Sequence, residues 1–147
     1  MSGYDYASAI TGCTTDVRGR FTISSSSFQM LADGSVATGG PGRAPGPLDF
    51  LVSALVTNML NVLRGAGDPD LDEAEARAVH VRARVSRYLP DRLKAGRLTV
   101  DVVIDELDAL DTEVLIEQYR DGCLVLPAVE TVLDVDIRAV AADEVAA

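Results

Sequence analysis

The chain has 147 residues, of which 48% are hydrophobic and 24% are charged. This length and composition fit one globular domain with a buried core, and they exclude an intrinsically disordered chain. The formal net charge is −10 at pH 7. It argues against nucleic acid or an anionic membrane surface as a partner, because phosphate groups are bound by clustered Lys and Arg.

Several motifs are absent, and their absence excludes further classes of protein. The N-terminal sequence MSGYDYASAI lacks the basic start and long apolar core of a signal peptide, so we expect a cytoplasmic protein. The cysteines, Cys13 and Cys123, are too few for a disulfide framework. A single histidine, His80, excludes a His-rich metal site within one chain. No CxxC, HExxH, phosphate-binding loop or GxSxG motif occurs, so neither a metal nor a cofactor is predicted.

The segment 1–46 predicts short β-strands that lead into a loop. Strands are expected at 8–15 and 21–25, where β-branched, aromatic and small residues gather around the turn-forming sequence of 16–19. A run of serines favours a second turn, from which 28–31 returns as a third strand.

The next part of the same segment is expected to hold one more strand before regular structure ends. Asp33-Gly34 predicts a turn, followed by a short strand around 36–38. The sequence GGPGRAPGP at 39–47 is too rich in Gly and Pro for a helix or a strand. It therefore reads as a loop that runs directly into the following helix.

Residues 47–64, with the sequence PLDFLVSALVTNMLNVLR, predict a long central helix. The segment is apolar on nearly every side, and such a helix belongs inside a protein or between two subunits. Polar side chains nevertheless recur every four residues, with Asn58 beside the lower end of this ladder: Asp49, Ser53, Thr57 and Asn61. Because buried polar groups need partners or a function, we expect the functional site on this helix.

A β-hairpin is predicted at the start of the segment 78–147, after a short exposed helical piece at 70–76. Apolar and polar residues alternate over 79–88 and again over 98–105, and a Pro- and Gly-containing connection joins the two runs. In an antiparallel hairpin, Arg82 and Arg84 are expected to face Asp101 and Asp105 across the strands.

A second helix and a closing strand complete the chain. The helix is expected to be capped by Asp111 or Thr112 and to end near Gly122. The alternation over 130–139 predicts a last strand with one acidic face. The order of elements indicates an α+β fold with an antiparallel sheet, a single domain over 1–147 and no membrane-spanning segment. A second subunit is the simplest cover for the other side of the central helix, so a homodimer is predicted.

The segment Pro47–Asn58, PLDFLVSALVTN, resembles the central-helix motif P-x-E-L-L-x-A-A-L-x-x-C of the OsmC/Ohr superfamily, the osmotically inducible and organic hydroperoxide resistance proteins. The order of elements fits as well, and Cys123 falls where the superfamily has its second cysteine. The resemblance implies antiparallel β-sheets wrapped around a long buried central helix in an intertwined homodimer, with the active site at the subunit interface. It also implies that a first cysteine attacks a hydroperoxide and the second cysteine resolves the sulfenic acid as a disulfide.

The chain departs from this pattern at the residues that carry the chemistry. Asn58 stands at the position of the peroxidatic cysteine, and a carboxamide cannot be oxidised to a sulfenic acid. Asp49 replaces the Glu of the motif. Thr38 falls near the position expected for the superfamily Arg, for which Arg43 or Arg20 are the available substitutes.

Two functions from different classes follow. The first is a member without thiol-peroxidase activity that binds a small, partly apolar ligand at the dimer-interface pocket. Its candidate residues are Asp49, Ser53, Thr57, Asn58, Asn61, Arg43 and Cys123. The alternative is an antioxidant enzyme that reduces organic hydroperoxides with Cys123 or Cys13. A dimeric scaffold for another protein is a third reading. A purely structural role is the alternative at each of these positions. Asn58 is then a helix residue held by a hydrogen bond, Asp49 a partner of the helix dipole, and Cys123 a small buried residue.

Overall fold

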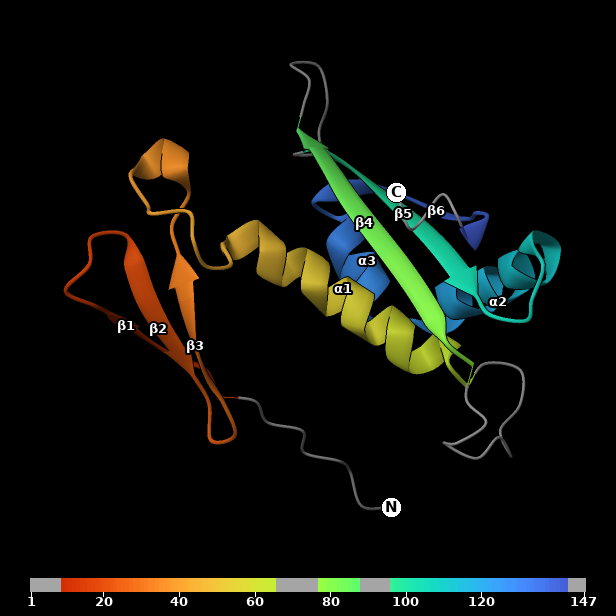
Figure 1. Ribbon diagram of the computed structural model, residues 1–147, viewed down its shortest axis with the longest axis horizontal. Helices are drawn as coiled ribbons and strands as arrows, with labels where there is room; N and C mark the ends of the chain where they lie inside the picture. Colours follow the sequence, from red (N-terminus) through yellow and green to blue (C-terminus); the bar gives the residue numbers. More distant parts are fainter. Residues whose placement is uncertain (1–8, 66–76, 88–95, 143–147) are drawn as a thin grey trace. The chain divides into compact units, whose positions relative to one another are not determined.

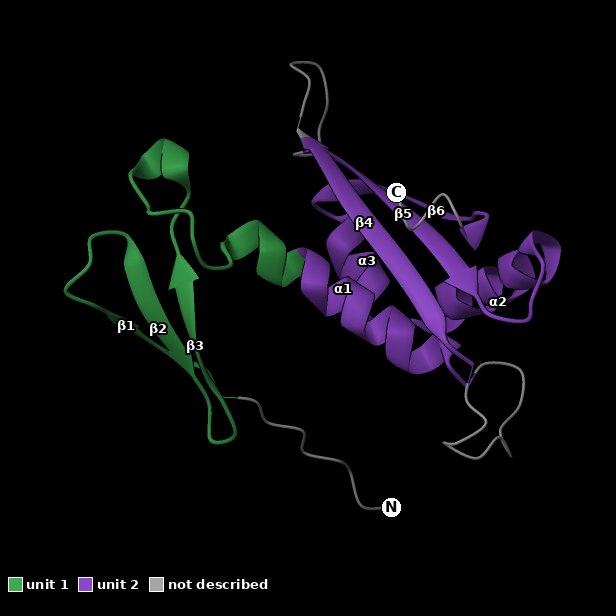
Figure 2. Ribbon diagram, in the orientation of Figure 1, with its two compact units in different colours: residues 1–51 green, residues 52–147 purple. Residues whose placement is uncertain are grey.

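A computed structural model describes residues 9–65, 77–87 and 96–142 of the chain (Figure 1). It divides into two compact units, residues 1–51 and residues 52–147 (Figure 2). The division falls inside the central helix, five residues after the predicted end of the N-terminal strands and loop. The helical piece predicted at 70–76 lies outside the described residues.

The first unit contains a three-stranded antiparallel sheet in the order β1-β2-β3. The strands are β1 (Thr11–Thr14), β2 (Arg20–Ser24) and β3 (Gln29–Asp33), each within a few residues of a predicted strand. Gly19 closes the first hairpin with φ = 78°, a left-handed conformation that glycine adopts at no steric cost. The predicted turn at 16–19 is therefore confirmed.

The prediction of a strand around 36–38 is wrong. Val36–Thr38 forms a 3₁₀ turn, η1. The hydroxyl of Ser35 accepts a hydrogen bond from the amide of Ala37, and Gly39 ends the turn in the left-handed region at φ = 91°. These two local caps outweigh the strand preference of Val and Thr.

Asp33 holds the Gly- and Pro-rich loop that follows. Its side chain is buried and accepts hydrogen bonds from Arg20 Nε at 2.8 Å and Nη2 at 3.0 Å. The same carboxylate accepts the backbone amides of Arg43 at 2.8 Å and Ala44 at 2.9 Å. The backbone amide of Asp33 donates to Pro45 O at 3.0 Å. One carboxylate thus fixes a segment that has no regular hydrogen bonding of its own.

The central helix, α1 (Pro47–Leu63), begins where the sequence predicted and ends one residue earlier. Asp49 Oδ2 accepts the amide of Gly46 at 2.8 Å and so satisfies a donor at the helix start. Among the described residues, one side of the helix is buried, through Leu55, Met59 and Leu63. The expectation of a helix buried on all sides is therefore not met by one chain alone.

The second unit contains a three-stranded sheet in the order β4-β5-β6. The strands are β4 (Val79–Arg87), β5 (Gly96–Ile104) and β6 (Leu133–Ala139). The first two form the predicted antiparallel hairpin, whereas β6 pairs with β5 in parallel. The expectation of a wholly antiparallel sheet is wrong here. A helical crossover between β5 and β6 returns the chain to the end of the sheet from which β5 started.

That crossover consists of α2 (Ala109–Gly122) and α3 (Val125–Glu130), which pack on one face of the sheet. Asp108, rather than Asp111 or Thr112, caps α2 by accepting the amide of Asp111 at 2.8 Å. The short helix α3 was not predicted. The apolar core between helices and sheet includes Leu98, Val100, Val102, Ile104, Ile116, Tyr119, Leu126, Val129, Leu133 and Ile137.

The opposite face of this sheet is charged. The register sets Arg82 opposite Asp101, and Arg84, opposite Thr99, reaches Asp101 diagonally, with Nη2 2.8 Å from Oδ2. Asp105, which was expected to face an arginine, lies 3.7 Å from His80 Nε2. The expected α+β fold is confirmed. No helix in the described part of the chain is long and apolar enough to span a membrane.

Asp33 makes the stability of the loop dependent on pH. The hydrogen bonds from Arg20 and from the amides of Arg43 and Ala44 hold the pKa of Asp33 well below its ordinary value of 3.8, against the opposing effect of burial. A carboxylate with a lowered folded-state pKa stabilises the fold above its unfolded-state pKa, and this stabilisation is lost as the pH falls toward the folded value. We expect the hydrogen-exchange protection of the Arg43 and Ala44 amides to be constant above roughly pH 5 and to fall below roughly pH 4.

Asp33→Asn should lower that protection at neutral pH and remove its dependence on acid. Asp16→Asn, in the exposed β1–β2 turn, is the matched control and should leave the protection unchanged. Protection that stays constant down to about pH 3 in the unmodified protein would contradict this role of Asp33.

Candidate ligand site at Asn58, Tyr119 and Cys123

Three polar side chains from distant parts of the second unit meet at one point. Tyr119 Oη donates a hydrogen bond to Asn58 Oδ1 at 2.7 Å. Cys123 Sγ lies 3.1 Å from the same oxygen and 3.0 Å from Tyr119 Oη. The site therefore joins the middle of α1 to the end of α2, over a sequence separation of more than sixty residues.

The end of α2 positions two of these groups. Tyr119 and Cys123 are four residues apart, so they lie on the same side of the helix, one turn from each other. Cys123 terminates α2 with an extended backbone, and its amide donates to Tyr119 O. The chain then turns into α3, and the amide of Leu126 donates to Cys123 Sγ at 3.2 Å. The sulfur is thus held by hydrogen bonds on both sides.

Tyr119 is a fixed donor in this network. Its side chain is only 3% exposed. Burial, together with the neighbouring Cys123, raises the pKa of Tyr119 far above its ordinary value, so the phenol stays protonated at physiological pH. The phenol hydrogen points to Asn58 Oδ1, and the phenol oxygen is an acceptor for the thiol of Cys123. A neutral amide, a neutral phenol and a thiol therefore satisfy one another.

A pocket of about 300 Å³ opens beside these groups. This volume is at the lower end of the range for small-molecule sites. Leu124, which is 90% exposed, and Val62 contribute apolar surface. Gly122, the last residue of α2, also lines the pocket. The described side chains of the lining are all uncharged: Asn58, Val62, Gln118, Tyr119, Cys123 and Leu124.

The structure brings Asn58 and Cys123 together among the predicted site residues. Ser53, Thr57 and Asn61 are exposed on α1 and do not line this pocket. Their position follows from the helix geometry, because they lie on the side opposite Leu55, Met59 and Leu63.

The remaining candidates belong to the first unit. Arg43 binds Asp33 through its backbone amide, and Arg20 binds the same carboxylate through its guanidinium. Asp49 accepts the amide of Gly46. Cys13 is exposed on β1. No group of three or more His, Cys, Asp or Glu side chains that would hold a metal occurs within residues 9–65, 77–87 and 96–142.

Sequence reasoning missed Tyr119 and Gln118. A usable signal was present for the tyrosine, because Tyr119 and Cys123 have the spacing of four that places two side chains on one helix face. A tyrosine one turn before a helix-terminating cysteine is therefore worth examining as a partner of the thiol.

Comparisons with models of protein families and with curated proteins find no match. Solved structures do match over nearly the whole chain. An organic hydroperoxide resistance protein OsmC from Legionella pneumophila has a TM-score of 0.69 at 16% identity, covering 95% of this chain and 100% of that one. An OsmC-like protein from Mycoplasma pneumoniae has a TM-score of 0.64 at 19% identity, covering 93% and 99%.

The organic hydroperoxide resistance protein OhrB of Bacillus subtilis has a TM-score of 0.63 at 14% identity, covering 92% of this chain and 98% of that one. At such low identities the likeness shows the fold, and the chemistry has to be inferred from the residues of the site. The resemblance to the OsmC/Ohr superfamily is therefore confirmed at the level of architecture: this chain has the OsmC-like fold.

Proposed function

We propose that this protein binds a small, uncharged and partly apolar molecule in the pocket beside Asn58, Tyr119 and Cys123, and that it lacks thiol-peroxidase activity. One observation carries the proposal. The amide of Asn58 joins the phenol of Tyr119 and the thiol of Cys123 in a pocket whose described lining is uncharged.

The missing peroxidase activity rests on the chemistry of the thiol. In the superfamily motif a cysteine occupies the position of Asn58, and a carboxamide cannot take its place in attacking an O–O bond. Cys123 remains, but cysteine reactivity requires the thiolate, which proteins favour with a neighbouring cation or a helix N-terminus. None of the described side chains that line the pocket is Lys, Arg or His.

The ligand class follows from the same lining. A charged ligand would lose its hydration without gaining a counter-charge, which is unfavourable in a partly enclosed site. The amides of Asn58 and Gln118 offer donors and acceptors to a neutral oxygen, and Val62 and Leu124 offer contact to an apolar group. A small alcohol, ketone or ester of moderate size fits this combination.

We also propose that the protein is a homodimer. The support is the uncovered side of α1, where Ser53, Ala54, Thr57 and Asn61 are exposed in a single chain. Small side chains of this kind allow two helices to approach closely. Sedimentation equilibrium should give twice the mass of one chain, and a mass equal to one chain would remove this part of the proposal.

The neutral probe 2-phenyl-2-propanol should bind saturably to the unmodified protein, and 2-phenylpropanoate, an anion of similar size, should bind more weakly. Leu124→Ser should weaken binding of the alcohol roughly fivefold, because it removes about 1 kcal/mol of apolar contact. Leu110→Ser is the matched control, since Leu110 is 74% exposed and lies outside the pocket. Titration followed by NMR chemical shifts measures each affinity. Equal effects of the two substitutions, or no saturation, would contradict the proposed site.

The unmodified protein should show no dithiol-dependent turnover of cumene hydroperoxide, whereas Asn58→Cys should gain it. No cation of the described lining favours ionisation of the introduced thiol, so the gained turnover should be slow. The thiolate fraction would attack the peroxide, become a sulfenic acid and release the alcohol once its oxygen is protonated. Cys123 would then condense with it to a disulfide and release water, and an added dithiol would reduce the disulfide. The 3.1 Å contact between Asn58 and Cys123 supports this pairing. Turnover by the unmodified protein that disappears in Cys123→Ser would overturn the proposal.

That last outcome defines the second candidate function, an antioxidant enzyme that uses Cys123. The observation in its favour is that Cys123 Sγ lines the pocket and accepts the amide of Leu126, which places a hydrogen-bonded sulfur within reach of a bound molecule. Sulfenic acid trapped on Cys123 at stoichiometric peroxide is the result expected of this alternative. An unmodified thiol under the same conditions removes it.

A further inference from the structure

A second hollow lies on the other side of the second unit, far in chemical character from the pocket beside Asn58. The strand register places polar side chains in three rows across the face of the β4–β5–β6 sheet that is turned away from α2 and α3. We call this the outer face. The three rows are Arg82, Asp101 and Arg138; Arg84, Thr99 and Asp136; and Ser86, Arg97 and Asp134.

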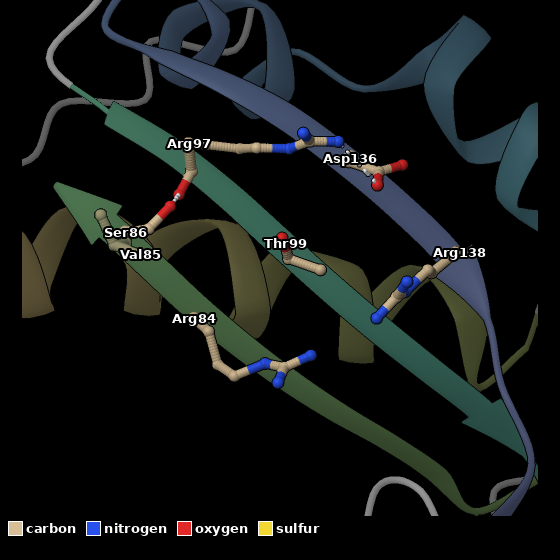
Figure 3. A pocket seen from close by; sticks show the side chains of 7 residues that line it. All are labelled: Arg84, Val85, Ser86, Arg97, Thr99, Asp136 and Arg138. Atoms are coloured by element: carbon tan, nitrogen blue, oxygen red, sulfur yellow. Dashed lines mark hydrogen bonds and ion pairs between the residues drawn. The ribbon is translucent and has the colours of Figure 1, made fainter. Parts of the chain in front are cut away.

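The hollow has a volume of about 500 Å³. Figure 3 shows it with Thr99 at the middle of the face and the long side chains of Arg84, Arg97 and Arg138 around it. Arg84 comes from β4, Arg97 from β5 and Arg138 from β6. All the strands of this sheet therefore contribute a guanidinium to one site.

Asp101 orders two of these guanidiniums. Its carboxylate is only 3% exposed, although it lies on the outer face. Arg138 Nε donates to Asp101 Oδ1 at 2.7 Å, and Arg84 Nη2 donates to Asp101 Oδ2 at 2.8 Å. A guanidinium carries five N–H donors, so the bond from Arg84 Nη2 to Asp101 leaves other donors of the Arg84 fork for a ligand. The two side chains remain about half exposed.

The third guanidinium is held more loosely. Arg97 Nη2 lies 3.3 Å from Asp136 Oδ2, and both side chains are largely exposed. Exposed ion pairs of this kind contribute little to stability, so Arg97 can exchange its partner at small cost. Three arginines line the hollow, against Asp136 in the lining and Asp101, which binds two of them, in a chain whose net charge is −10. A local positive charge on an acidic protein is suited to selecting an anion.

We propose that this hollow binds a small dianion, the phosphate or dicarboxylate portion of a small molecule, over Thr99. Arg84 and Arg138 approach the anion in an orientation fixed by Asp101. The hydroxyl of Thr99 donates from below, and Arg97 turns from Asp136 to the ligand. Planar guanidinium groups match the oxygen spacing of phosphate and carboxylate, and their hydrogen bonds to such oxygens are strong because both partners are charged.

The test is a titration of the full chain with inorganic phosphate and, separately, with succinate, followed by NMR chemical shifts. Sodium chloride at matched ionic strength is the reference for general charge screening. We expect saturable binding of at least one anion, with shifts at Thr99 and its neighbours. Phosphate alone would assign a phosphoryl group to the ligand, and succinate alone would assign a dicarboxylate.

Arg97→Gln should weaken that binding about tenfold, because it removes one charge-assisted contact. Thr99→Val, which keeps the net charge and a β-branched strand residue, should weaken it severalfold. Arg120→Gln is the matched control, since it removes the same charge from an exposed pair with Glu117 on α2. It should leave the affinity unchanged.

The proposal is wrong if both anions act only as chloride does, or if Arg97→Gln and Arg120→Gln have equal effects. It is also wrong if polyglutamate binds to the outer face while both small anions fail, because the face would then be a docking surface for an acidic protein.

Discussion

The alternation of side chains along β5 is the constraint from which both proposed sites derive. Leu98, Val100, Val102 and Ile104 are almost fully buried against the helices, and burying each such side chain contributes about 1.5–3 kcal/mol. A shift of one residue in register would turn all of them to the outside, so the register is strongly determined. The helices α2 and α3 pack on this inner face, and their packing determines the positions of Tyr119 and Cys123. The same register aligns Arg97, Thr99 and Asp101 on the outer face.

The two sites differ in the charge of their side chains. At Asn58 the polar groups are neutral and form hydrogen bonds with one another, so the pocket offers hydrogen-bonding groups without a net charge. On the outer face the groups are charged, and the buried Asp101 compensates two cations while leaving them half exposed. An uncharged pocket excludes ions through the loss of hydration, whereas a cationic hollow attracts them. The two proposed sites therefore suit different classes of ligand, one among the helices and the other on the outer face of the sheet.

Sequence patterns predicted those features that depend on a few neighbouring residues. The alternation over 79–88 and 98–105 located the hairpin. Its register sets Arg82 opposite Asp101, while Arg84, opposite Thr99, reaches Asp101 diagonally. Alternation also found β6, but it carries no information on which strand lies beside it or in which direction, so the parallel pairing was missed. The cap of α2 was expected at Asp111 or Thr112, whereas Asp108, three residues before Asp111, caps the helix. The contact of Asn58 with Cys123 was reached through the resemblance to a known family, while Tyr119 needed the folded geometry.

The parallel pairing of β6 also sets an order on folding. The hairpin β4–β5 joins strands that are adjacent in sequence, whereas β6 reaches β5 only after the chain has passed through α2 and α3. Closing that longer loop carries more chain entropy, so β6 and the crossover dock after the hairpin has formed. Tyr119 and Cys123 lie in the crossover, and their meeting with Asn58 belongs to this late step. The pocket therefore forms in the same step that covers the apolar inner face of β5.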